Sequence, residues 1–241
     1  MEKTVKENSY TNQEKNAISD GILLVDKEQE WTSFDVVARL RNVLHIKKIG
    51  HAGTLDPMAT GLLIVLVGRS ATKQCEKIMG HEKEYVATML LGTVTDTQDI
   101  WGNVIGGSEA SADLVSDEQL NDALERFRGE TDQIPPMYSA IKIKGQKLCD
   151  VARRGEEIER EPRHINILSL ELLSREGREV HLRIRCSPGT YIRTLCNDIG
   201  EVLGCGACMS ALRRIRIGNF SIDDSHRISE IKNDEYLIRI E

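Results

Sequence analysis

Gly50-His-Ala-Gly-Thr-Leu-Asp-Pro-Met-Ala-Thr-Gly61 is the densest group of informative residues in this 241-residue chain. Its glycines flank one histidine and one aspartate, and glycine allows tight turns and close approach of a ligand to the backbone. The apolar run Leu62–Val67 follows at once and predicts a buried strand. Asp56 would then be fixed against a rigid element, a common position for a catalytic group. A structural turn in which Asp56 caps the backbone ahead of Pro57 explains the same spacing, so both interpretations stay open.

The segments on either side of this motif predict an α+β fold. Gly21–Val25 is a short apolar strand, and Thr32 caps a helix whose apolar residues recur at helical spacing. Residues 94–115 are rich in Thr, Asp, Gly and Ser and predict a loop or insertion. The strands and helices do not alternate regularly, which argues against a doubly wound sheet. Further strands are predicted at 83–92, 163–173 and 178–186, and helices at 70–79, 116–129, 146–154 and 190–203.

A second motif, Cys186-Ser-Pro-Gly-Thr-Tyr-Ile-Arg193, joins a predicted strand to a predicted helix. Tyr191 and Arg193 fall in the first turn of that helix, where the positive end of the helix dipole suits a phosphate or a partner carboxylate. A packed tyrosine and a surface arginine are the simpler interpretation. Short basic clusters at 39–48, 142–147 and 213–216 either follow phosphates or are solvated faces.

The net charge of −6 by itself argues against a nucleic-acid partner, because phosphate binding requires a basic surface. The charge is unevenly distributed, however. Residues 94–133 carry ten acidic and two basic side chains, and residues 221–241 carry six and three. Residues 134–220 carry fifteen basic and ten acidic side chains, which leaves room for a basic face.

Composition excludes several classes of protein. Hydrophobic residues at 40% and charged residues at 29% are typical of a globular protein and exclude wholesale disorder and collagen-like repeats. The longest apolar run, Leu62–Val67, is too short to span a bilayer, and no secretory signal opens the chain, so we expect a cytoplasmic protein. Cys205-Gly-Ala-Cys208 has the spacing of half a zinc site but lacks a suitable second pair. We therefore predict no metal site and expect the six cysteines to be free thiols.

Taken in order, the motifs resemble the TruB family of tRNA pseudouridine synthases. The resemblance covers residues 21–220. Besides the two motifs quoted above, it rests on Gly21-Ile-Leu-Leu-Val-Asp-Lys27, Trp31-Thr-Ser33, Gly68-Arg-Ser-Ala-Thr-Lys73, Lys83-Glu-Tyr85, Leu91-Gly-Thr-Val-Thr-Asp-Thr-Gln-Asp99, Ile134-Pro-Pro-Met-Tyr-Ser-Ala-Ile-Lys142, Ala152-Arg-Arg-Gly155, Leu203-Gly-Cys-Gly-Ala207 and Leu212-Arg-Arg214. It implies the pseudouridine synthase fold, with a mixed, largely antiparallel central sheet flanked by helices.

The resemblance also implies an activity: isomerisation of the T-loop uridine of tRNA after the base is flipped into the active site, without cofactor or metal. Asp56 would be the essential carboxylate, Arg193 its ionic partner, and Tyr85 the residue that stacks on the base and takes the C5 proton. His51 would hold the extruded state, while Tyr191 and Leu212 would line the base pocket. The basic clusters would follow the T-arm backbone. The alternative is a catalytically silent RNA-binding protein or RNA chaperone with the same fold.

The domain organisation implied by the resemblance is a mobile tail over residues 1–20 and one catalytic domain over residues 21–241, with an acidic insertion near 94–133. Typical relatives carry a C-terminal RNA-binding PUA domain, and the 21 residues after Phe220 are too few to form one. No oligomerisation signal is evident, so we expect a monomer. The loop Asp26-Lys-Glu-Gln-Glu30 departs from the family pattern of Asp-Lys-Pro-x-Gly.

Overall fold

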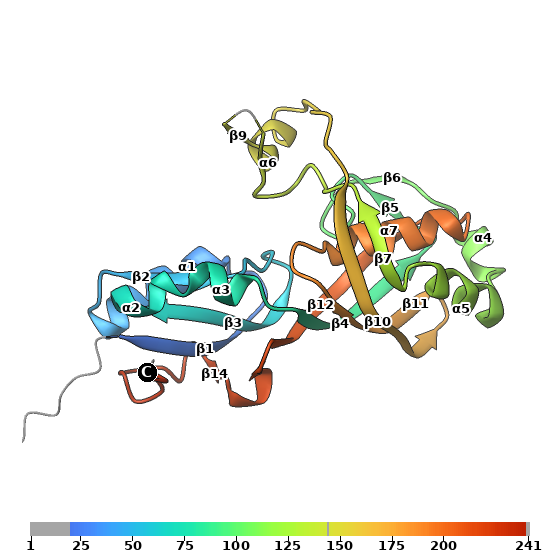
Figure 1. Cartoon of the computed structure of the whole chain (residues 1–241). Helices are drawn as coiled ribbons and strands as arrows, with labels where there is room; N and C mark the ends of the chain where they lie inside the picture. Colours follow the sequence, from blue (N-terminus) through green and yellow to red (C-terminus); the bar gives the residue numbers. More distant parts are fainter. Residues whose placement is uncertain (1–19, 144, 240–241) are drawn as a thin grey trace, which may run out of the picture.

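The computed structural model describes residues 20–143 and 145–239, so the tail predicted over 1–20 lies outside them, apart from Asp20. A ten-stranded sheet runs through the molecule (Figure 1). Eight strands form its main path, in the order β14-β1-β3-β12-β4-β11-β10-β7, while β2 (Ile49–Ala52) pairs with β3 and β13 (Phe220–Ser221) with β12. The eight are β1 (Gly21–Lys27), β3 (Thr60–Val67), β4 (Lys83–Leu91), β7 (Gly129–Gln133), β10 (Arg163–Glu176), β11 (Glu179–Cys186), β12 (Ala207–Ile217) and β14 (His226–Arg227).

The pairing of these strands confirms the predicted α+β fold with a largely antiparallel sheet. Only the β1–β14 and β3–β12 pairs are parallel among the pairs of this sheet in the described residues. None of the helices in that part of the chain is long and apolar enough to cross a membrane.

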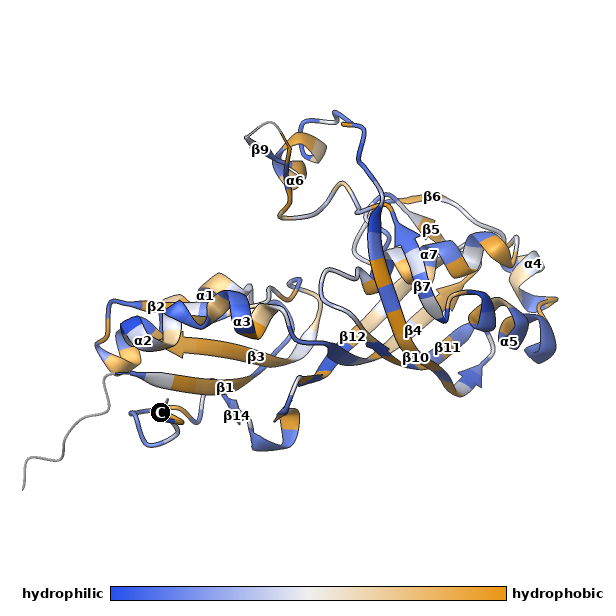
Figure 2. Ribbon diagram, viewed as in Figure 1, coloured by the Kyte–Doolittle hydropathy of each residue, from blue (hydrophilic) through white to orange (hydrophobic). Residues whose placement is uncertain are grey.

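One lobe is built on β1 and β3, which are buried on both faces. Their side chains pack on one face against α1 (Ser33–Leu44) and on the other against α2 (Gly68–Lys73) and α3 (Cys75–Met79). Burial on both faces explains why β3 is apolar without interruption from Leu62 to Val67, as its colour in Figure 2 shows. Thr32 and Asp35 form a capping box that fixes the start of α1.

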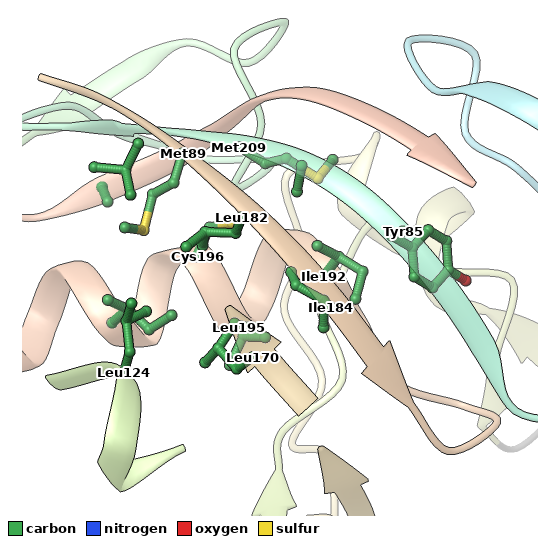
Figure 3. Close-up of a cluster of buried hydrophobic side chains, with 14 of the residues drawn as sticks. Tyr85, Met89, Leu124, Leu170, Leu182, Ile184, Ile192, Leu195, Cys196 and Met209 are labelled. Atoms are coloured by element: carbon green, nitrogen blue, oxygen red, sulfur yellow. The ribbon is translucent and has the colours of Figure 1, made fainter. Parts of the chain in front are cut away.

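The second lobe contains the larger core, between the strands β4, β10, β11 and β12 and the helices α5 (Asp117–Arg126) and α7 (Ile192–Val202). Figure 3 shows Leu182 and Ile184 of β11 in this core beside Cys196 and Ile192 of α7. Along β11 the buried apolar residues alternate with exposed arginines, and the strand predicted at 178–186 is confirmed. Ser116 and Gln119 form a capping box that fixes the start of α5, within the helix predicted at 116–129.

Smaller elements sit around the two lobes. The predicted loop 94–115 contains a hairpin of β5 (Val94–Thr95) and β6 (Val104–Gly106), followed by α4 (Glu109–Asp113). The segment 134–162 projects away from both lobes (Figure 1). The helix predicted at 146–154 is present but shorter, as α6 (Leu148–Ala152), and it is preceded by a hairpin of β8 (Lys142–Ile143) and β9 (Gln146–Lys147). A 3-10 turn, η1 (Ile222–Asp224), follows β13.

Strand β12 lies at the centre of the sheet, although the sequence pattern did not predict it. Its pairing with β4 shifts register between Met209 and Ala211 and again between Arg214 and Arg216. These irregularities break the strict alternation of inward and outward side chains by which a strand is recognised. As a result, Arg214 points into the protein and is only 1% exposed.

Candidate active site

Asp56 lies on the loop between β2 and β3, and this loop is held from several sides. Ser33 Oγ accepts a hydrogen bond from Leu55 N at 3.0 Å and donates to Leu55 O at 3.2 Å. Glu30 N donates to Pro57 O at 2.9 Å. Leu55 and Met58 insert into the larger core on either side of Asp56. The carboxylate of Asp56, with a side chain 36% exposed, is therefore presented from a fixed backbone.

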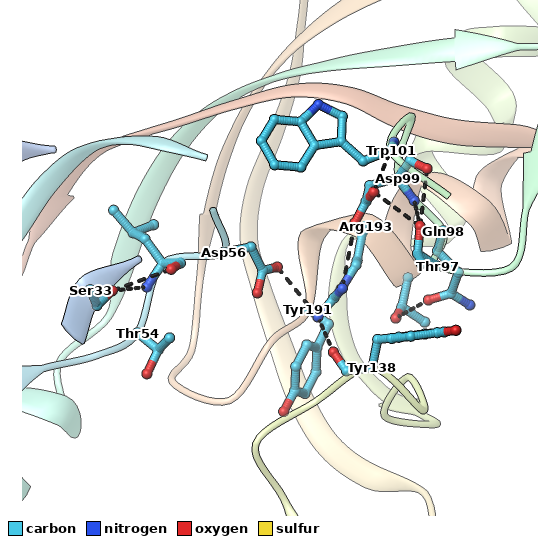
Figure 4. A network of polar contacts seen from close by, with 12 residues as sticks. Ser33, Thr54, Asp56, Thr97, Gln98, Asp99, Trp101, Tyr138, Tyr191 and Arg193 are labelled. Carbon is cyan, nitrogen blue, oxygen red and sulfur yellow. Dashed lines mark hydrogen bonds and ion pairs between the residues drawn. The ribbon is translucent and has the colours of Figure 1, made fainter. Parts of the chain in front are cut away.

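Arg193, in the first turn of α7, is buried and lies between two carboxylates (Figure 4). Its Nη2 is 3.3 Å from Asp56 Oδ2 and donates to Tyr138 O at 2.6 Å, while its Nη1 is 3.5 Å from Asp99 Oδ2. The pairing of Asp56 with Arg193 expected from the resemblance is present. The simpler interpretation, a surface arginine, is wrong because the helix turns this residue into the protein.

Asp99 is a site residue that the sequence analysis did not single out. It is buried, and its Oδ1 accepts hydrogen bonds from Thr97 Oγ1 at 3.0 Å and from the backbone N–H of Trp101 at 3.1 Å. Burial raises the pKa of Asp99, and these hydrogen bonds together with Arg193 partly offset that rise. The motif Thr95-Asp-Thr-Gln-Asp99 was the available signal, but its contact with Arg193 depends on the fold.

Tyr85 on β4 is 6% exposed and lies between Ile184 of β11 and Arg214 of β12 in the sheet register. Burial raises the pKa of its hydroxyl to about 12, against the opposing influence of the Arg214 guanidinium. Tyr85 therefore stays protonated at neutral pH. Its ring belongs to the larger core, and its hydroxyl lies at the edge of that core in Figure 3.

Arg214 fastens the Asp56 loop to β12. Its Nε donates to Leu62 O at 2.8 Å and its Nη2 to Gly53 O at 3.0 Å. The prediction that the cluster 213–216 follows phosphates is wrong for Arg214, because its guanidinium is buried and donates its hydrogen bonds to backbone carbonyls inside the protein. Arg213 is half-buried and forms a two-pronged pair with Asp26, at 3.0 and 2.8 Å.

Two buried lysines also support the site and were not predicted. Lys27 is 1% exposed, and its Nζ donates to Trp31 O at 2.7 Å, Glu28 O at 3.0 Å and Pro57 O at 3.4 Å. Lys83 Nζ donates to His81 O at 2.7 Å and to Met79 O at 2.8 Å. Burial lowers the pKa of each to about 8. The loop Asp26-Lys-Glu-Gln-Glu30 differs from the family pattern in sequence, but Lys27 and Glu30 both donate hydrogen bonds to Pro57 O and so hold it against the Asp56 loop.

Most of these charged and aromatic groups line a cleft of about 840 Å³, although Lys27 and Arg213 do not. Of the predicted site residues, Asp56, Tyr85, Tyr191, Arg193 and Leu212 line it, so the structure brings five of the six together. His51, on β2, is not among the described residues that line the cleft. It is half-buried, burial and Arg214 lower its pKa, and its Nδ1 is buried with no hydrogen-bond partner in the described chain.

The remaining basic residues are mostly on the surface. Arg39, Lys47 and Lys48 are exposed, whereas Arg41 is half-buried and donates to Ile49 O at 2.8 Å. Lys147 is exposed and lines the cleft, and Lys144 lies outside the described residues. Within residues 20–143 and 145–239, no three His, Cys, Asp or Glu side chains are grouped so as to hold a metal ion, and the six cysteines are free.

Comparison with known proteins points to one family. Residues 41–192 match the family model described as TruB family pseudouridylate synthase (N terminal domain). Residues 193–239 match the model described as tRNA pseudouridylate synthase B C-terminal domain. The boundary between the two models falls within α7, and the second contains the central strand β12, so both matched regions contribute to one sheet.

Named relatives agree with this match. The chain is 49% identical to tRNA pseudouridine synthase B of Endomicrobium trichonymphae, covering 91% of this chain and 94% of that one. It is 47% identical to the protein of the same name from Clostridium tetani, covering 92% and 77%. A solved chain from a crystal structure of a Cbf5-Nop10-Gar1 complex superposes with a TM-score of 0.69 at 32% identity, covering 89% of this chain and 54% of that one. The chain thus spans about half the length of that solved protein.

Proposed function

The chain belongs to the TruB family of pseudouridylate synthases, and we propose on this premise that it isomerises the T-loop uridine of tRNA to pseudouridine. In this reaction the bond between ribose C1′ and base N1 breaks and a bond between C1′ and C5 forms. The proton leaves C5 and N1 gains one. Atoms and electrons balance without an oxidant, a reductant or a leaving group.

The observation that carries the proposal is the ion pair between Asp56 and Arg193 inside the cleft. A carboxylate that acts on an uncharged base must stay ionised when RNA excludes water from the site. The guanidinium of Arg193 favours the ionised form and limits the directions in which the carboxylate can point. Asp56 would act on uracil C6, on ribose C1′, or by assisting formation of a glycal.

Tyr85, on the wall of the cleft, fits the role of the residue that stacks on the uracil base. A hydroxyl with a pKa of about 12 is a weak proton acceptor near neutral pH, so its protonated state favours a stacking surface over a base. An apolar ring face beside Asp56 would hold the uracil flat while its glycosidic bond is broken. Tyr191 and Leu212 would complete the walls around the base.

The target uridine must leave the folded T-loop to reach Asp56, because the carboxylate lies within a cleft. Exposed Lys47, Lys48 and Lys147 would follow the T-arm backbone and read its shape. His51 would lie against the RNA beside the cleft.

We further propose that the protein acts as a monomer in the cytoplasm, where its tRNA substrate would be found. Light scattering during gel filtration tests the monomeric state, and cell fractionation tests the cytoplasmic localisation.

The decisive experiment incubates the full-length protein with a T-arm hairpin that carries 5-tritiated uridine and measures tritium release, with chemical mapping of pseudouridine. Asp56→Asn should abolish release while it keeps RNA binding, because the amide preserves shape but not charge. Asp132→Asn, an exposed carboxylate on β7, is the matched control and should retain activity. Tight binding by the wild-type protein without any pseudouridine would instead identify a silent RNA-binding protein.

A further inference from the structure

Trp101 is an exposed aromatic side chain on the wall of the cleft. Among the large apolar side chains of the described residues that are more than a third exposed, only Met79 and Trp101 line the cleft. Trp101 is 52% exposed, so much of its ring is free to contact a molecule that enters the cleft. Figure 4 shows its indole extending from its loop toward the side of the cleft on which Asp56 lies.

The backbone that carries Trp101 is fixed on both sides. Before it, Thr95 Oγ1 donates to Asp99 O at 2.7 Å, and Ile100 N donates to Met209 O at 2.9 Å. After it, Asn103 donates to the Asp96 carboxylate from its N at 2.9 Å and from its Nδ2 at 3.0 Å. The indole is therefore presented from a rigid turn, which lowers the entropy cost of using it as a contact surface.

The same turn connects Trp101 to the Asp56–Arg193 pair. The backbone N–H of Trp101 donates to Asp99 Oδ1, and Asp99 is the second carboxylate beside Arg193. An occupant resting on the indole would thus lie next to the Asp56–Arg193 pair. Tyr85, which is buried and also lines the cleft, would supply an aromatic face for the target base, so the indole is available to a different nucleotide.

Base flipping creates a need for such a surface. When a nucleotide leaves a stacked loop, each of its two neighbours loses a stacking partner, and exposed aromatic rings are the usual replacement in proteins that bind unpaired RNA. We propose that Trp101 stacks on the loop base adjacent to the target uridine and thereby holds the RNA in its opened form. This inference rests on the proposed function and adds a substrate-positioning residue to it.

The test uses the fact that the chain has only two tryptophans. Trp31 is half-buried against the core on the α1 side of β1, away from the cleft lining. Trp31→Phe therefore leaves Trp101 as the single tryptophan, whose emission can be excited selectively over that of the five tyrosines, and adding Asp56→Asn allows binding to be followed without turnover. A T-arm hairpin should quench the emission of Trp101. The same hairpin with an abasic site on one side of the target should lose that quenching, while an abasic site on the other side should not.

Kinetics supply the second readout. Trp101→Ala should raise KM for the hairpin about tenfold and change kcat by less than about twofold, because stacking supports binding of the loop and not bond breaking. Trp101→Phe should restore most of the loss, whereas Trp101→Leu should not. All three variants keep the backbone N–H that binds Asp99. Phe34→Ala, which truncates a 64% exposed aromatic outside the cleft lining, is the matched control and should leave KM unchanged.

The outcomes separate the two proposals. Absence of pseudouridine with the wild-type protein would overturn the proposed function. Normal pseudouridine formation, combined with quenching that persists in both abasic hairpins or a Trp101→Ala variant with an unchanged KM, would overturn the role of Trp101 alone.

Discussion

Arg214 and Gly53 are joined by a 3.0 Å hydrogen bond from the guanidinium Nη2 to the backbone carbonyl, and this bond ties β12 to the loop that carries Asp56. The same guanidinium donates to Leu62 O and interacts with the Tyr85 hydroxyl. One buried side chain thus fixes the distance between the aspartate loop and the tyrosine.

Replacing Arg214 should therefore damage both the fold and the reaction. Arg214→Lys cannot reproduce the planar set of donors, so at least one buried carbonyl loses its partner. We expect a loss of ~2–4 kcal/mol in the free energy of unfolding and a lower kcat. Urea denaturation and steady-state kinetics measure the two effects. Arg213→Lys, at the half-buried pair with Asp26, is the control and should cost under ~1 kcal/mol.

Asp99→Asn should reduce turnover more than binding. Asparagine keeps an acceptor for the Trp101 N–H but removes the charge that orients Arg193 from the side opposite Asp56. We expect kcat to fall roughly tenfold, since hydrogen bonds to charged groups contribute ~1.5–3 kcal/mol. Initial rates over a range of hairpin concentrations separate kcat from KM. An unchanged kcat would show that Asp99 does not position Arg193.

Gly61→Ala should destabilise the protein by at least ~2 kcal/mol. A Cβ at this position would lie 2.3 Å from the backbone oxygen of Arg214, and the φ of +99° disfavours any side chain. Thermal unfolding followed by circular dichroism measures the loss. Gly177→Ala separates the clash from the strain, because Gly177 also has a positive φ (+59°) but a Cβ there meets no atom within 4 Å. We expect the control to cost about 1–2 kcal/mol, from strain alone.

Lys27 should make stability depend on pH in alkaline solution. Its pKa of about 8 in the folded protein lies below the ordinary value of 10.5, so the unfolded chain binds more protons between these values. The contribution of Lys27 to stability therefore rises as pH increases from 8 to 10.5 and is constant below pH 8.

Thiols of the unfolded chain also titrate in alkaline solution, so the measurement is the difference in unfolding free energy between the wild-type protein and Lys27→Met. This difference should shift in favour of the wild type by up to ~3 kcal/mol across the window. Denaturation series at pH 7.5 and about pH 10.5 determine it. A difference that does not change with pH would mean that Lys27 keeps an ordinary pKa in the folded state.

Sequence reasoning located the parts of the site that lie within short motifs. The glycine-rich loop around Asp56 and the turn that leads to Arg193 could be recognised because each motif is continuous along the chain. The contacts of Arg214, Lys27 and Asp99 could not, because each depends on segments that meet only in the folded sheet. For Arg214 the two register shifts in β12 decide that the side chain faces backbone carbonyls inside the protein, and no local sequence pattern encodes these shifts.

Strand β12 also determines the point during protein synthesis at which the residues of the site can come together. Asp56 and Tyr85 are made early, but the guanidinium that anchors the aspartate loop is near the end of the described chain. β12 lies between β3 and β4, so the two lobes have no shared strand until it has left the ribosome and entered the sheet. A nascent chain that ends before β12 would hold Asp56 on a loop that lacks its Arg214 anchor, so the loop would reach its final position only when β12 enters the sheet.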